Sequence, residues 1–184
     1  MIRSLLFSAL ALSLSATGPA PAAHWDFEQE TPTLEQGWAS CSDQIAAGTS
    51  FIRVSARKDG PNQALQLSGR AIGIEAGPAA GIVDPFVCAI RYLGATPSRP
   101  ADFSGATTLS FRIKGRSQVV EVALFQDGQG ARPSIRPVKV TPEWTEYRIP
   151  MASFGLDTSR LTAVAIGRST AGSIDVLVDD IRMQ

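Results

Sequence analysis

Carboxylates gather near both ends of this 184-residue chain. The segment WDFE carries Asp26 and Glu28, and the segment IDVLVDDIRM carries the adjacent pair Asp179 and Asp180. Strands disfavour Asp, so the pair needs an explanation. If the first and last strands of a sandwich lie side by side, oxygen ligands from both ends converge, and Ca²⁺ is the cation that matches them. Alternatively, the acids discourage association through sheet edges.

Adjacent residues on a strand point to opposite faces. Asp179 and Asp180 therefore cannot serve the same purpose, and we predict that Asp179 ligates calcium together with Glu28. The other acid of the pair would then face solvent or protect an edge.

Aromatic and polar side chains suggest a second kind of site. The flat faces of sugars stack on Trp and Tyr, and we select Trp38 and Tyr92 because both lie near the cysteines in the sequence. Arg112 and Glu121 have the non-core parity of their strands and could line a sheet face, or they could be ordinary solvated positions. Trp144 could join a glycan platform or fill the core.

The chain lacks a recognisable catalytic pattern. Its one histidine, His24, lies beside the predicted start of the mature protein, where chains fray, which leaves no ordered imidazole for a serine or cysteine nucleophile. The sequence contains no P-loop, dinucleotide fingerprint or HExxH motif. We therefore expect no enzyme activity, although a hydrolase or lyase using two carboxylates is an alternative.

Cys41 and Cys88 are the only cysteines. In an oxidising compartment such a pair is first interpreted as a disulfide, which could stabilise the fold by about 4 kcal/mol. Two separate buried thiols are the alternative.

Residues 1–22 have the pattern of a cleaved signal peptide. Arg3 precedes the apolar run LLFSALALSL, and Ala20 and Ala22 match an A-x-A cleavage site. The apolar run is shorter than the roughly 20 residues of a membrane span. We expect an exported protein, periplasmic or extracellular, with residues 23–184 forming one domain.

Charge and pattern limit the class of that domain. The formal net charge is zero, with no basic patch of the kind that binds nucleic acid, and we expect a monomer. Short runs rich in Val, Ile, Phe and Thr are separated by turn residues, which is typical of an all-β protein. A two-sheet antiparallel β-sandwich is predicted, with a short helical turn within residues 150–161. The predicted strands are 24–28, 50–56, 63–71, 86–93, 107–115, 118–126, 134–140, 145–151, 161–168 and 174–183.

Four stretches together resemble one superfamily. They are WDFE, PADFSGATTLSFRIKG, PEWTEYRIPMASFG and DVLVDDIRM, and their order is similar to that of the galactose-binding-like jelly rolls. The chain most resembles the complex I intermediate-associated protein 30 domain and the family 11 carbohydrate-binding modules. The resemblance implies a non-catalytic jelly roll that binds a carbohydrate or, as an assembly factor, a protein partner. It also implies a structural calcium, with Glu28 and Asp179 in the positions of the conserved acids of those motifs.

Overall fold

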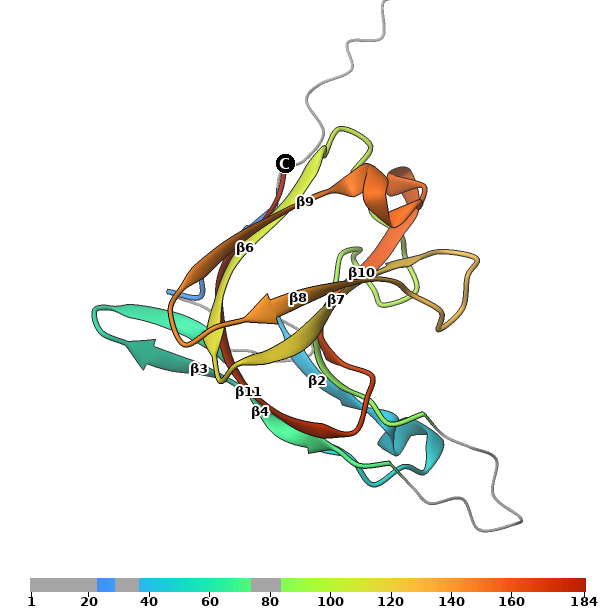
Figure 1. The fold of residues 1–184 in the computed structure, drawn as a ribbon. Helices are drawn as coiled ribbons and strands as arrows, with labels where there is room; N and C mark the ends of the chain where they lie inside the picture. The colour runs from blue at the N-terminus through green and yellow to red at the C-terminus, as the bar shows by residue number, and fades with distance from the viewer. Residues whose placement is uncertain (1–22, 29–36, 74–83) are drawn as a thin grey trace, which may run out of the picture.

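The computed structural model describes residues 23–28, 37–73 and 84–184, so the predicted signal peptide lies outside the described residues. Eleven strands and three short 3₁₀ helices are found in these segments (Figure 1). The strands are β1 (Ala23–Trp25), β2 (Ala39–Ser42), β3 (Phe51–Asp59), β4 (Asn62–Ala71), β5 (Val87–Tyr92), β6 (Thr108–Gly115), β7 (Gln118–Gln126), β8 (Ser134–Val140), β9 (Thr145–Pro150), β10 (Leu161–Arg168) and β11 (Gly172–Met183). The 3₁₀ helices are η1 (Asp43–Ala46), η2 (Met151–Phe154) and η3 (Thr158–Arg160). None of the helices in the described segments is long and apolar enough to span a bilayer.

The strands form two antiparallel sheets, which confirms the predicted β-sandwich. The six-stranded sheet has the order β3-β4-β11-β6-β9, with β1 paired to β11, and the five-stranded sheet has the order β2-β5-β10-β7-β8. Figure 1 shows β6, β9 and β11 in one layer and β7, β8 and β10 in the other. The pairing of β1 with β11 joins Ala23 to Met183 and Trp25 to Ile181. This confirms that the chain-end segments lie side by side.

Most predicted strands are confirmed with small shifts at their ends, and η2 and η3 occupy the predicted helical turn. Strand β2, with the sequence ASCS, was not predicted. All four of its residues are small or polar, so no apolar alternation marks it. Its position depends instead on pairing with β5, in which Cys41 lies opposite Cys88.

Alternating apolar residues of both sheets fill the space between them. In β6 the alternating residues Leu109, Phe111 and Ile113 are buried, as the period of a strand requires. Trp38 also belongs to this core: its side chain is 0% exposed, and its ring meets that of Trp25 edge-on at 5.9 Å. The prediction that Trp38 binds a ligand is therefore wrong, because no face of the ring is available to a sugar.

Candidate functional site

Two aromatic side chains flank the central strand of the five-stranded sheet. In the strand registers Ala163 of β10 lies opposite both Tyr92 of β5 and Phe125 of β7. Their neighbours Val164 and Leu124 belong to the core, so alternation places these three residues on the outer face. Strands lie about 4.8 Å apart, which separates the two aromatic positions by about 10 Å. We call Tyr92, Ala163 and Phe125 the aromatic row.

The next row across the same face is apolar as well. It contains Ile90, Ala165, Ala123 and Ile135 on four consecutive strands. Ala165 and Ala123 are buried although neither belongs to the core cluster, which indicates that they lie low between longer side chains. The exposed face of an antiparallel sheet is normally polar. An apolar outer face therefore marks a candidate binding surface.

A third row closes this face with polar groups and the disulfide. Cys41 and Cys88 are bonded with Cα atoms 5.0 Å apart, which confirms the predicted pair. The same row continues through Gly167 to Glu121. The Glu121 Oε1 atom accepts a hydrogen bond of 2.8 Å from the Ser169 hydroxyl. A carboxylate held in this way can accept further hydrogen bonds from a ligand hydroxyl.

The outer face of the six-stranded sheet has a different character. Trp144 lies there, and its indole N–H donates a hydrogen bond of 2.8 Å to Asp59. Lys114 donates to the other Asp59 oxygen at 2.7 Å. The Lys114 and Arg112 side chains each approach the Trp144 ring to 5.1 Å, a cation–π distance. Trp144 therefore does not fill the core, where Tyr147 instead stacks on Phe111.

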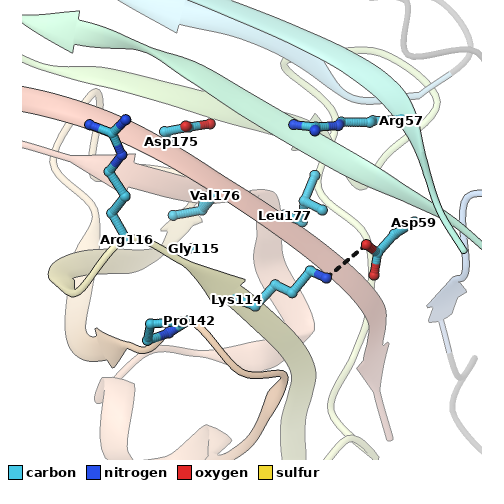
Figure 2. Close-up of a pocket in the computed structure, with 9 residues that line it drawn as sticks. All are labelled: Arg57, Asp59, Lys114, Gly115, Arg116, Pro142, Asp175, Val176 and Leu177. Atoms are coloured by element: carbon cyan, nitrogen blue, oxygen red, sulfur yellow. Dashed lines mark hydrogen bonds and ion pairs between the residues drawn. The ribbon is translucent and has the colours of Figure 1, made fainter.

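A pocket of about 360 Å³ opens beside this network (Figure 2). Arg57 and Arg116 lie at its two ends, and Asp175 and Leu177 lie between them. Lys114, hydrogen-bonded to Asp59, forms the side of the pocket. The hydrogen bond from Lys114 is the main cause of the lowered pKa of Asp59, followed by the bond from Trp144. Asp59 is therefore ionised at neutral pH.

The predicted calcium ligands are only partly brought together. Within the described segments, no three His, Cys, Asp or Glu side chains are grouped to hold a metal ion. Asp180 is paired with His24 and Arg182 at 3.0 Å each. Asp26 accepts a hydrogen bond from the Glu28 backbone N–H at 3.3 Å. These contacts occupy Asp26 and Asp180 with protein partners.

Asp179 and Glu28 remain the pair of carboxylates whose negative charge a bound cation would offset most. Asp179 is only 6% exposed, and burial is the main cause of its raised pKa. The hydrogen bond from the Asp180 backbone N–H and the positive charge of Arg112 lower that pKa, while the negative charges of Asp180 and Glu28 raise it. Both are oxygen donors of the kind that a hard cation prefers, and Ca²⁺ bound here would offset this negative charge, but the Asp179 Oδ1 atom already accepts a 2.7 Å hydrogen bond from the Asp180 backbone N–H. The Glu28 Oε1 atom also accepts a 3.0 Å hydrogen bond from the Gln63 backbone N–H.

The backbone is unusual at the same place. Phe27 and Asp180 have φ angles of 61° and 53°, in the left-handed region that bulky residues rarely adopt. Such conformations cost about 1–3 kcal/mol and cluster at functional sites. Phe27 lies two residues after the last paired residue of β1, Trp25. Asp180 lies within β11, where the register with β6 shifts between Asp179 and Arg182.

The predicted ligand-binding residues are thus distributed over three places. Tyr92 and Glu121 share the outer face of the five-stranded sheet, Arg112 lies on the opposite outer face, and Trp38 is in the core. Sequence reasoning missed Phe125 as a binding candidate. The available signal was its parity in QVVEVALFQ, where it alternates with the buried Val120, Val122 and Leu124.

Several solved structures share this architecture. The family 11 carbohydrate-binding module from Clostridium thermocellum, solved with a β-1,3-1,4-mixed-linked tetrasaccharide, aligns with a TM-score of 0.66 and 14% identity over 88% of this chain and 94% of that one. This chain has the fold of that module. A family 30 carbohydrate-binding module of a cellulosomal cellulase from the same organism gives a TM-score of 0.62 at 14% identity, covering 88% and 97% of the two chains.

The same fold occurs within a larger enzyme chain. An exo-β-agarase matches with a TM-score of 0.59 and 14% identity over 87% of this chain but 24% of its own. No protein-family model matches the sequence, and no curated protein matches it. At 14% sequence identity, the similarity to carbohydrate-binding modules shows a shared fold.

Proposed function

We propose that this protein is an exported, non-catalytic module that binds a neutral carbohydrate across the outer face of its five-stranded sheet. The observation that carries the proposal is the aromatic row, in which Tyr92 and Phe125 flank the small side chain of Ala163. The pyranose ring of a sugar presents flat C–H surfaces that pack on aromatic rings. The similarity in fold to modules solved as carbohydrate binders supports the same reading.

The other rows of this face supply what a sugar also needs. Ile90 and Ile135 extend the apolar surface to both sides of β10, and Glu121 provides an acceptor for hydroxyl groups. A few polar groups placed within an apolar surface are typical of small-molecule sites. None of the three solved structures is an assembly factor, so the scaffold alternative has no support here.

The proposal is tested by calorimetric titration with a β-1,3-1,4-mixed-linked glucan oligosaccharide. Tyr92→Ala and Phe125→Ala each remove one ring of the aromatic row. By analogy with aromatic anchors at interfaces, each change is expected to cost about 1–2 kcal/mol of binding free energy, which weakens Kd roughly five- to thirtyfold.

Phe51→Ala is the matched control, because Phe51 is 55% exposed and lies on β3 of the other sheet. It is expected to leave Kd unchanged. Failure of the wild-type protein to bind neutral glucans, or equal affinity in the Tyr92→Ala variant, would overturn the proposal.

We further propose that Ca²⁺ binds between the chain-end segments through Glu28 and Asp179. Its role would be structural, because the ion would hold the segment after β1 against the irregular part of β11. Support comes from the buried Asp179 carboxylate, its raised pKa and the two left-handed backbone positions nearby.

A further inference from the structure

We propose that the pocket on the outer face of the six-stranded sheet is a second binding site, which takes a saccharide bearing carboxylate or sulfate groups. This site goes beyond the neutral-sugar function, because it lies on the other sheet and uses other side chains. The residues that line it include positively charged side chains, the carboxylate of Asp175 and the apolar side chain of Leu177 (Figure 2).

Two guanidinium groups in this pocket are available to a ligand. Within the described part of the chain, neither Arg57 nor Arg116 has a hydrogen bond or ion pair, and Arg57 acts on Asp59 only through its charge, as the least of the causes that lower the Asp59 pKa. Arginine stays charged at all relevant pH values, and its planar donors match the geometry of a carboxylate or sulfate. Figure 2 shows the two groups at opposite ends of the pocket, so each could bind an anionic substituent on a different sugar unit.

The side of the pocket is held in place before any ligand arrives. The Lys114 ammonium is 2.7 Å from Asp59, and Asp59 also accepts the 2.8 Å bond from Trp144. These contacts join β3, β6 and the segment before β9. They also satisfy the Asp59 charge within the protein, so that it opposes an incoming anion less. A site ordered in advance pays less conformational entropy on binding.

The middle of the pocket favours a sugar over a simple anion. Asp175 lies there without an ion pair to either arginine among the described residues, and a carboxylate accepts hydroxyl hydrogens. Leu177 is buried yet absent from the core cluster, which places an apolar side chain on the pocket floor. A ligand with anionic groups at its ends, hydroxyls between them and C–H surfaces matches all three features.

The experiment measures binding of three oligosaccharide probes to the full chain at about 50 mM salt, where screening is weak. The probes are oligogalacturonate, a sulfated galactan oligomer and a neutral galactan oligomer of the same length. At least one anionic probe is expected to bind more tightly than the neutral one. Arg57→Gln and Arg116→Gln are each expected to weaken that binding about tenfold.

Arg53→Gln is the matched control. Arg53 lies four positions before Arg57, on the same face of β3, and does not line the pocket. It should leave the affinity unchanged, as should Tyr92→Ala, which tests the other face separately. Preference for the carboxylate or for the sulfate probe would identify the anionic group. Absence of binding to both anionic probes, or an equal loss in Arg53→Gln, would overturn the proposal.

Discussion

The Cys41–Cys88 disulfide gives a prediction whose size follows from the topology. It joins β2, at the edge of the five-stranded sheet, to β5. We expect the double variant Cys41→Ala/Cys88→Ala to fold with lower stability. The four backbone pairs of β2 with β5 would then hold that strand without a covalent link.

The expected loss comes from the loop that the bond closes. The two cysteines are separated by 47 residues, and the chain-entropy model gives about 4 kcal/mol at 25 °C for such a loop. At about 2.1 cal/mol/K of unfolding entropy per residue, a domain of this length would melt roughly 12 °C lower. Partial structure in the unfolded chain would reduce both figures.

Urea denaturation followed by tryptophan fluorescence measures this loss. Wild-type protein with a reductant should match the double variant, and the reductant should not change the double variant. A loss below about 1 kcal/mol with an unchanged m-value would refute the entropic argument. The glucan titration should also be repeated on the variant, because Cys88 lies two positions before Ile90 on the proposed sugar face.

Other consequences concern the two perturbed carboxylates. Saturating calcium, at about a hundred times Kd, should add about 2.7 kcal/mol of stability; Glu28→Ala should abolish this gain, and identical melting curves with and without a chelator would exclude the ion. The pKa of Asp179 is raised above its value of 3.8 in the unfolded chain. With chelator present, the stability of the wild-type protein should therefore fall as pH rises from 3.8 through the higher folded pKa. Urea titrations at several pH values should show a smaller fall for Asp179→Asn. Asp59 has a lowered pKa, so its contribution to stability is complete above pH 3.8 and is lost as pH falls through the folded pKa. NMR titration of the carboxyl group should find a higher Asp59 pKa in Lys114→Met, and an unchanged pKa would contradict the assigned cause.

Sequence patterns were sufficient where burial alternates along a strand. The strand Thr108–Gly115 was predicted almost to the residue, because Leu109, Phe111 and Ile113 alternate with polar side chains. The pairing of β1 with β11, which the calcium hypothesis required as its condition, is present in the structure. Strand β2 was missed because its place depends on β5 and the disulfide, neither of which leaves an apolar period in ASCS.

Side-chain environments were harder to predict because they depend on distant segments. Trp38 precedes β2 directly, yet it is buried by Trp25 and Phe27. Trp144 could be assigned to either face until Asp59, 85 positions away, was seen to accept its N–H. Strict alternation at Asp179 and Asp180 does not hold either, because Asp180 adopts a left-handed φ within a register shift.

The burial of β10 on both faces has a consequence for the unfolded chain. From Leu161 to Ile166 the strand contains no charge and no proline, which is the composition of segments that stack into intermolecular β-structure. Arg160 and Arg168 stand near its two ends, where flanking charges oppose such stacking. In the native fold, β5 and β7 cover both edges of β10, so its amides should be among the slowest to exchange with solvent. The segment that most needs protection from self-association is therefore the one exposed last.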